Sequence, residues 1–291
     1  MSSVATLRIE PAGREPSPRQ FVMCRPDHFE VFYSINPWMN PQEPVDRALA
    51  LSQWEVLRAT FEQYGHRIEV VPGEPGLPDM VFAANSGLIV GDRAMSARFT
   101  HPERAAEGPA FHRWFAQRGM AELVGAQEIN EGEGDFLLVG DRMLAATGFR
   151  SSIAAHREVE RYFDLPVVSL ELVDPRFYHL DTALMVLDDS NVAYFPPAFS
   201  RASQAILAEL YPDAILATDD DAVVLGLNGV SDGLNVFISS RAENLASQLR
   251  GQGYNPVGVD LSELLKAGGG VKCCTLEIHE DPRSAPTAVA S

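Results

Sequence analysis

The chain has 291 residues, of which 46% are hydrophobic and 22% are charged, so its composition is that of a folded globular protein and excludes a disordered or coiled-coil chain. Forty acidic residues outnumber 23 basic ones, and the formal net charge of −17 argues against nucleic acid and anionic membranes as partners. A small cationic substrate is compatible with this charge, although many acidic proteins carry it for solubility alone.

The cysteines and the chain ends indicate the compartment and the number of domains. One cysteine, Cys24, is isolated and the other two are adjacent, so we expect reduced thiols in a reducing compartment. No run of 18 apolar residues is present, and the first 20 residues lack the apolar stretch of a signal peptide, which favours a cytoplasmic protein. Because no internal linker is evident, we expect one domain over residues 20–279, with flexible segments at residues 1–19 and 280–291.

Apolar periodicity predicts strands and helices that alternate along the chain. Strands are expected at Phe21–Cys24, Arg67–Val71, Val81–Val90, Phe136–Val139, Met143–Ala146, Val167–Leu170, Ala183–Leu187, Val192–Tyr194, Val223–Leu225, Val236–Ser239 and Cys274–Ile278. Helices are expected at Pro44–Tyr64, Glu103–Arg118, Ser152–Phe163, Ser200–Leu210, Arg241–Gly251 and Leu261–Ala267. Strand pairs interleave with helices roughly five times, and no dinucleotide-binding or phosphate-binding glycine motif is found, so the pattern favours a radially repeated α/β fold.

A glycine-rich segment near the C-terminus is the first candidate for chemistry. Three glycines at positions 268–270 precede Lys272 and the thiols of Cys273 and Cys274. Glycines let the backbone approach a ligand closely, and a cation beside a thiol favours the reactive thiolate. The alternative is that both cysteines are small buried residues at the start of a strand.

A histidine and a carboxylate stand close together in Phe177–Thr182. His179 and Asp181 alternate on a predicted strand, so we expect both side chains on the same face. A histidine exchanges protons with a thiol and with a leaving amine near neutral pH. A core histidine with a carboxylate partner is the alternative.

Three acids follow one another in a glycine-rich turn before the strand that is expected at Phe136. Glu131, Glu133 and Asp135 alternate with two glycines, and acids at a strand end can orient a histidine or bind a cation. The alternative is a solvated turn. No spacing that is typical of a metal site occurs in the sequence, so no metal is expected.

Four further polar residues stand at the ends of predicted strands. Asp79 and Asn85 bracket one apolar strand, while Arg98 and Arg150 come just after others. Arginines at such positions can hold a carboxylate with two parallel hydrogen bonds, but a surface charge is the alternative for each of them.

Together these segments resemble the guanidino-group-modifying enzymes, the superfamily of arginine deiminase and dimethylarginine dimethylaminohydrolase. The resemblance runs from Phe21 to Ile278, and its arginine dihydrolase-like branch is the most similar. The shared segments are Met23-Cys-Arg-Pro-Asp-His28, Ile35-Asn-Pro-Trp-Met39, Pro78-Asp-Met-Val-Phe82, Phe177-Tyr-His-Leu-Asp-Thr182 and the pair Lys272-Cys273. The resemblance implies a pentein fold, an α/β-propeller of five ββαβ units with pseudo-fivefold symmetry and a central active site.

The resemblance also implies roles for individual residues. Cys273 matches the nucleophile and His179 matches the general acid and base, with Glu131 as its partner and Glu133 as the second choice. Asp79 and Asp181 match acids that contact the guanidinium group. Arg98 and Arg150 match arginines that bind the substrate carboxylate. Cys274 matches a packed neighbour of the nucleophile, and no cofactor is implied.

Two asparagines separate this chain from simple deiminases. Deiminases and many dimethylargininases carry an aspartate for the guanidinium where this chain has Asn85, and the dihydrolase-like branch has asparagine there and at Asn36. An amide loses the charge of a carboxylate but adds a hydrogen-bond donor. We therefore expect both asparagines to contact substrate, and we expect chemistry other than simple deimination.

The function predicted from these residues is cysteine-dependent hydrolysis of a guanidinium C–N bond through a covalent thiouronium intermediate. The expected substrate is arginine or methylated arginine, with citrulline and an amine as products. Three alternatives stay open: an arginine dihydrolase that yields ornithine, carbon dioxide and ammonia; an amidinotransferase; and a non-catalytic binding protein of the same fold. The sequence is compatible with a homo-oligomer and does not define the oligomeric state.

Overall fold

The computed structural model describes residues 13–284 as a mixed α/β fold. Its helices are α1 (Arg47–Gln63), α2 (Glu107–Arg118), α3 (Ile153–Phe163), α4 (Leu180–Ala183), α5 (Arg201–Leu210), α6 (Asp219–Ala222), α7 (Glu243–Gly251) and α8 (Ser262–Leu265). The strands are β1 (Gln20–Cys24), β2 (Arg67–Val71), β3 (Gly87–Val90), β4 (Arg93–Ser96), β5 (Glu122–Gly125), β6 (Phe136–Val139), β7 (Arg142–Thr147), β8 (Val167–Glu171), β9 (Leu184–Asp188), β10 (Asn191–Tyr194), β11 (Ile215–Leu216), β12 (Val230–Ser231), β13 (Asn235–Ser239), β14 (Asn255–Val259) and β15 (Leu276–His279).

One pattern of strand pairing recurs along the chain. In each case an antiparallel pair is followed by a helix and then by a third strand that lies parallel to the second. The sets β3-β4-α2-β5, β6-β7-α3-β8, β9-β10-α5-β11 and β12-β13-α7-β14 follow this pattern. A further set joins the two ends of the chain, because β15 pairs antiparallel with β1, and β2 follows α1 as the parallel neighbour of β1.

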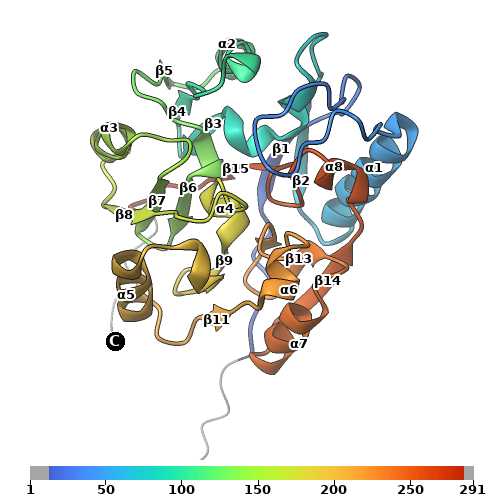
Figure 1. The fold of residues 1–291 in the computed structure, drawn as a ribbon. Helices are drawn as coiled ribbons and strands as arrows, with labels where there is room; N and C mark the ends of the chain where they lie inside the picture. The colour runs from blue at the N-terminus through green and yellow to red at the C-terminus, as the bar shows by residue number, and fades with distance from the viewer. Residues whose placement is uncertain (1–12, 285–291) are drawn as a thin grey trace, which may run out of the picture.

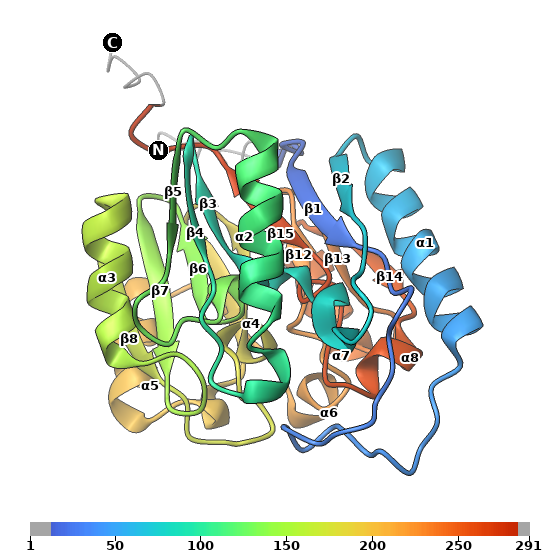
Figure 2. The ribbon, with the colours of Figure 1, turned by 90° about the horizontal axis from the view of Figure 1, so that it is seen from above.

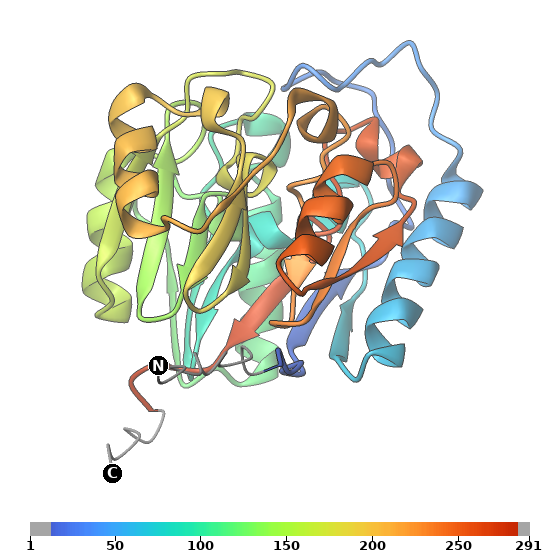
Figure 3. The same ribbon diagram turned by 90° about the horizontal axis from the view of Figure 1, so that it is seen from below.

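These sets do not form one closed sheet within residues 13–284. Strand β15 also pairs with β3, which gives a six-stranded sheet of order β2-β1-β15-β3-β4-β5, and the remaining strands form three sheets of three strands each. In Figure 1, α1, α2, α3, α5 and α7 lie at the periphery and the strands lie inside them. Figures 2 and 3 show α1 and α3 at two opposite sides of the molecule, with the strands between them.

Each peripheral helix turns an apolar face toward the strands. In α1 the buried residues Ala50, Trp54, Leu57 and Phe61 recur at helical spacing, and Asp46 caps the first turn by accepting a hydrogen bond from Leu49 N. Burial of this stripe holds α1 against β2 and α8.

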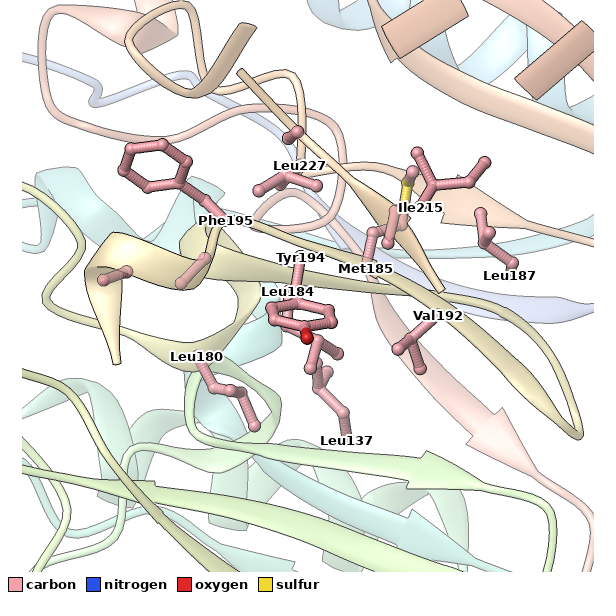
Figure 4. Packing of buried hydrophobic residues seen from close by; sticks show 14 of the residues in the cluster. Leu137, Leu180, Leu184, Met185, Leu187, Val192, Tyr194, Phe195, Ile215 and Leu227 are labelled. Atoms are coloured by element: carbon pink, nitrogen blue, oxygen red, sulfur yellow. The ribbon is translucent and has the colours of Figure 1, made fainter. Parts of the chain in front are cut away.

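The largest apolar cluster of the described residues lies between the strand sets β6–β8 and β9–β11, the strand β13 and the helix α7. Figure 4 shows the side chains of Leu137 on β6, Leu184 and Met185 on β9, and Val192 and Tyr194 on β10 packed around one another. Strand β9 thus contacts neighbours from more than one set. This packing fixes the start of β9, which immediately follows α4 and the residues His179 and Asp181.

Three predicted strands are wrong, and each error has a local cause. Only Gly87–Val90 of the predicted Val81–Val90 is extended, because Pro78 starts a 3₁₀ turn at 78–81 and a second turn follows at 83–86. Residues 223–225 form a turn, since they continue from α6 after its Thr218 cap and Leu225 adopts a positive φ of 51°.

The strand predicted around His179 and Asp181 is also wrong. His179 instead precedes the one-turn helix α4, and Asp135 Oδ1 accepts a hydrogen bond from Leu180 N at the start of that turn. Thr182 Oγ1 donates to the carbonyl of His179 and tightens the turn further. The sequence pattern also missed β4, β5, β11, β12 and β14, which are short or have few apolar residues.

The chain ends fall largely outside the described residues. Most of the predicted flexible segment 1–19 and of the segment 280–291 cannot be compared with the structure, which describes residues 13–284. Within those residues, no helix has both the length and the apolar character that crossing a membrane requires.

Candidate active site

The polar residues singled out in the sequence meet just before the first strands of the repeated sets. Asn85 precedes β3, Glu131 precedes β6, His179 and Asp181 precede β9, and Cys273 precedes β15, each by at most five residues. The 3₁₀ turns 83–86 and 132–134 contact each other, and α4 contacts the second of them. Segments that are far apart in sequence therefore bring one cluster of polar side chains together.

The thiol of Cys273 is buried next to a carboxyl group. Its Sγ donates to Oδ2 of Asp181 at 3.2 Å, and Cys273 is 2% exposed. Burial raises the pKa of the Cys273 thiol well above its usual value, and the negative charge of Asp181 raises this pKa further. Near neutral pH the sulfur therefore carries its proton, and a positive charge close to it favours the thiolate.

Lys272 does not supply that charge through a direct contact with the sulfur. Its Nζ donates to Glu133 Oε2 at 2.5 Å and to the carbonyl of Thr275. Glu133 also accepts from Glu277 N at 2.8 Å and contacts His279 Nε2 at 2.7 Å. Both carboxylate oxygens of Glu133 therefore bond groups other than His179.

The partner of His179 is Glu131. Nε2 of His179 lies 2.8 Å from Oε2 of Glu131, and this same oxygen accepts from Arg150 Nη1 at 3.1 Å. The other oxygen of Glu131 accepts from Thr100 N at 3.0 Å. Burial alone would raise the pKa of Glu131, but the hydrogen bond with His179 and the charge of Arg150 outweigh it and hold this pKa below its usual range. Glu131 is therefore an anion that fixes the imidazole ring.

Three buried polar atoms of the cluster have no hydrogen-bond partner among residues 13–284. They are Oδ1 of Asp79, Oδ1 of Asp181 and Nδ2 of Asn85. Burial raises the pKa of the Asp79 carboxyl, and it raises that of Asp181 to about 6. Unpaired buried carboxylate oxygens are costly, and a cation that donates several hydrogen bonds relieves that cost. The two unpaired aspartate oxygens match the N–H donors of a guanidinium group, whereas Asn85 Nδ2 is itself a donor.

Asp79 and Asn85 are held by a buried arginine that the sequence analysis did not single out. Arg104 donates to Asn85 Oδ1 at 2.8 Å and to the carbonyl of Asp79 at 3.2 Å, and it pairs with Glu107 at 2.7 Å. Tyr33 OH donates to the remaining oxygen of Asp79 at 2.8 Å. Arg104 was missed because it lies in an ordinary-looking Pro-Glu-Arg turn, where only tertiary contacts reveal its burial.

The two arginines that were predicted to bind the substrate carboxylate, Arg98 and Arg150, lie in different surroundings. Arg150 is 7% exposed and lies in the cluster, with Nη1 on Glu131 and Nη2 on the carbonyl of Ile35. Arg98 is exposed, and its guanidinium donates to the carbonyl of Gln127 without a contact to the other candidate residues. Asn36 connects its own loop to the segment that follows α8. Its Nδ2 donates to Ala267 O, and its Oδ1 accepts from Trp38 N.

Relatives of the chain carry names that agree with this geometry. A dimethylarginine dimethylaminohydrolase of Mycobacterium tuberculosis is 54% identical over 96% of this chain and 92% of its own length. The chain belongs to the dimethylarginine dimethylaminohydrolase family. It therefore falls among the hydrolases that act on C–N bonds in linear amidines. No protein-family model matches the chain.

Arginine dihydrolases are also similar to this family member. The bifunctional arginine dihydrolase/ornithine cyclodeaminase AgrE of Nostoc is 37% identical over 91% of the chain, which spans 38% of that longer protein. The solved N-terminal domain of ArgZ, an arginine dihydrolase of cyanobacteria bound to product, superposes with a TM-score of 0.87 at 34% identity and covers 91% of this chain and 99% of that domain. A solved dimethylarginine dimethylaminohydrolase superposes with a TM-score of 0.72 at 19% identity over 89% of this chain and 99% of its own, so the mixed α/β fold is shared with both branches.

One further residue of the site escaped the sequence analysis. Asn228 is fully buried and contacts the sulfur, the backbone of Cys273 and the carbonyl of Asp181. The segment Leu-Asn-Gly-Val looks like an ordinary turn in sequence. Its position just before β12 repeats the position of the other site residues before their strands, and this spacing is the signal that could have found it.

Proposed function

We propose that this family member hydrolyses a guanidinium C–N bond of dimethylated arginine or arginine, with Cys273 as the nucleophile. The observation that carries the proposal is the Asp181 carboxyl group, because one of its oxygens receives the Cys273 thiol and the other lacks a partner in the described chain. A guanidinium cation bound to Asp181 and Asp79 brings its carbon next to the sulfur. The name of the Mycobacterium relative favours dimethylarginine.

In the first step the bound cation favours the thiolate, and the thiol proton passes to His179. The sulfur then attacks the guanidinium carbon, the carbon–nitrogen bond to the amine breaks, and His179 returns the proton to the departing nitrogen. Asp79 and Asp181 hold the remaining N–H groups of the substrate, and Glu131 stabilises the imidazolium form of His179. The product of this step is a thiouronium intermediate on Cys273.

In the second step water replaces the sulfur. His179 takes a proton from water, the oxygen adds to the carbon, and the carbon–sulfur bond breaks to restore the thiol after proton transfer. One turnover of dimethylated arginine yields citrulline and dimethylamine, whereas arginine yields citrulline and ammonia. We propose that Arg150 and Asn36 contact the amino-acid end of the substrate, and Arg98, whose side chain is exposed, is the weakest of the three candidates.

A specific contact favours arginine dihydrolase activity as the second candidate. Since Arg104 Nη1 donates to Asn85 Oδ1, the amide of Asn85 presents its Nδ2 donor to the site. A guanidinium group offers only donors, whereas the ureido group of citrulline has an acceptor oxygen. A fixed donor at Asn85 thus suits a second hydrolysis that converts citrulline to ornithine, carbon dioxide and ammonia. The dihydrolase names of AgrE and ArgZ agree with this candidate.

We propose that residues 20–279 form one catalytic domain in which the five strand sets surround a pseudo-fivefold axis, as in a pentein propeller. Support comes from the repeated strand pairing and from the site residues, which precede the first strands of successive sets.

Reduced thiols at all three cysteines support a cytoplasmic location. A small cationic substrate is the proposed partner.

Product analysis discriminates between these functions. The purified protein is incubated separately with asymmetric dimethylarginine and with arginine, and citrulline, ornithine and dimethylamine are quantified by mass spectrometry. Citrulline with equimolar dimethylamine supports the dimethylargininase, while ornithine from arginine supports the dihydrolase. A transferred amidino group on added glycine would indicate an amidinotransferase, and no product from any substrate would support the non-catalytic binding protein.

A further inference from the structure

Asn228 contacts the nucleophile loop at several points. Its side-chain Oδ1 accepts from Gly270 N and from Cys273 N, each at 3.0 Å. Its backbone carbonyl accepts from Lys272 N at 3.1 Å. Gly270 packs so closely that a Cβ atom there would lie 2.9 Å from Asn228 Oδ1. One asparagine therefore fixes the backbone from Gly270 up to the reactive Cys273.

The other end of the same amide faces the sulfur. Nδ2 of Asn228 donates to Cys273 Sγ at 3.1 Å and to the carbonyl of Asp181 at 3.1 Å. Asn228 is fully buried, so water does not compete for these hydrogen bonds. A donor aimed at sulfur is worth more to a thiolate than to a thiol, because hydrogen bonds to a charged acceptor are stronger.

The place of Asn228 in the repeated pattern gives independent support. Four of the strand sets contribute Asn85, Glu131, His179 with Asp181, and Cys273 to the site from the segment before their first strand. Asn228 is the residue that the remaining set, β12-β13-α7-β14, contributes from the equivalent segment.

We propose that Asn228 is a positioning residue for the nucleophile, which fixes the loop through Oδ1 and stabilises the thiolate of Cys273 through Nδ2. The inference rests on the proposed function for its catalytic consequence, but the contact with the sulfur exists without substrate. Its effect on the thiol is therefore measurable in the free protein. The charged or titratable groups around the sulfur are Asp181, His179, Tyr178, Lys272 and Cys274, and they are unchanged when only Asn228 is replaced.

Two substitutions separate the two ends of the amide. Asn228→Asp keeps an acceptor for the loop N–H groups and replaces the donor that faces sulfur, whereas Asn228→Ala removes both. Asn191→Asp is the matched control, since it makes the same chemical change at a residue that is 7% exposed and bonds to Gln252, Tyr254 and Val192 instead of the nucleophile.

The experiment measures the rate of alkylation of Cys273 by iodoacetamide from pH 6 to 10, with peptide mass spectrometry to separate Cys273 from Cys274. Because the pKa of the Cys273 thiol lies well above its usual value, the rate should rise throughout this range. We expect the rate at each pH to be about tenfold lower in Asn228→Ala, which loses the donor, and lower still in Asn228→Asp, which also adds a negative charge beside the sulfur. Asn191→Asp should react at the wild-type rate at each pH. Thermal unfolding identifies any variant that has lost its fold, and Asn228→Asp is the variant expected to retain it.

Turnover provides the second readout. With the substrate that the wild type consumes, kcat should fall about tenfold or more in Asn228→Asp while KM changes less than threefold, because Asn228 contacts the sulfur and not the substrate. A lower kcat with an unmoved alkylation profile would overturn the role in thiolate stabilisation. Unchanged values of both would overturn the whole inference. A shifted alkylation profile in a protein that consumes no guanidino compound would uphold the inference and reject the proposed function.

Discussion

Two neighbouring groups of buried polar residues differ in how completely they are paired. The reactive cluster, which comprises Cys273, His179, Asp181 and Asp79, keeps one oxygen of each aspartate without a partner in the described chain. The Glu133 cluster, which comprises Glu133, Lys272 and His279, lines a separate cavity. In it, both carboxylate oxygens of Glu133 are bonded.

This difference distinguishes buried charges that are placed to bind a ligand from buried charges that stabilise the fold. Glu131 and Glu133 stand two residues apart in one motif, and both are 1% exposed or less. The pKa of each is held below its usual range, although burial opposes this for both, because cationic or histidine partners outweigh it. Their partners differ: Glu131 bonds the imidazole of the reactive cluster, whereas Glu133 ties the nucleophile loop to β15.

The two adjacent cysteines give the largest contrast. Cys273→Ser should lower turnover by at least about 10³-fold, because a hydroxyl is a far weaker nucleophile than a thiolate. Cys274→Ser should retain turnover within about threefold, since Cys274 packs in the core and its sulfur forms no hydrogen bond with Asp181 or Asn228 in the described chain, unlike the sulfur of Cys273. Steady-state kinetics with both variants test this, and equal losses would contradict the assignment of the nucleophile.

The two glutamates should separate catalysis from stability. Glu131→Gln should lower kcat by about 10²–10³-fold, because a neutral amide no longer stabilises the imidazolium form of His179. Glu133→Gln should lower the free energy of unfolding by about 3–5 kcal/mol, since it leaves Lys272 buried without its counter-ion. Denaturant titration and kinetics on the same samples measure both effects. A Glu133→Gln protein that loses turnover but no stability would reverse the comparison.

Asp181 makes the reactive cluster sensitive to pH. Its pKa rises from an ordinary 3.8 to about 6 on folding, so between these values the folded chain binds more protons than the unfolded chain. The contribution of Asp181 to stability is thus present below pH 4 and is lost as the pH rises through about 6. In unfolding experiments from pH 4 to 7, Asp181→Asn should remove this part of the pH dependence.

The same ionisation should control substrate binding in the opposite direction. Because the ionised Asp181 attracts the cation, kcat/KM should fall as the pH drops below about 6, and a bound guanidino compound should stabilise the protein more at pH 7 than at pH 4. Ligand-induced shifts in the unfolding temperature measure this. A ligand shift that is independent of pH would contradict the ionic contact with Asp181.

The smallest effect is expected at the exposed arginine. Arg98→Gln should change KM by less than about threefold, since its side chain is exposed and bonds only to the carbonyl of Gln127 in the described chain. Arg150→Gln should raise KM by at least about tenfold and also lower kcat, because it removes a buried cation from Glu131. A tenfold increase in KM for Arg98→Gln would restore Arg98 to the carboxylate clamp.

The sequence allowed the prediction of the residue types at the site but not their local geometry. Cys273, His179 and Glu131 stand in motifs whose composition already indicates chemistry, and helices such as α1 have clear apolar periodicity. The turns around Asp79 and Asp181 look like strands because their apolar residues are buried on all sides, so polarity alternation does not distinguish them.

Contacts between distant segments account for the remaining differences. Arg104 and Asn228 acquire their roles from partners up to 47 residues away, and no motif in the residues next to either of them records such partners. The choice of Glu131 over Glu133 as the histidine partner also depends on where Lys272 and His279 arrive from the other end of the chain.

The most direct test of the central claim is to trap the covalent intermediate. The protein is mixed with dimethylarginine that carries a ¹³C-labelled guanidino carbon, quenched with acid during turnover, and digested for peptide mass spectrometry. We predict that the label is bound to Cys273, that it disappears as substrate is exhausted, and that citrulline and dimethylamine accumulate. Turnover without any label on Cys273, or with label on another residue, would contradict the account.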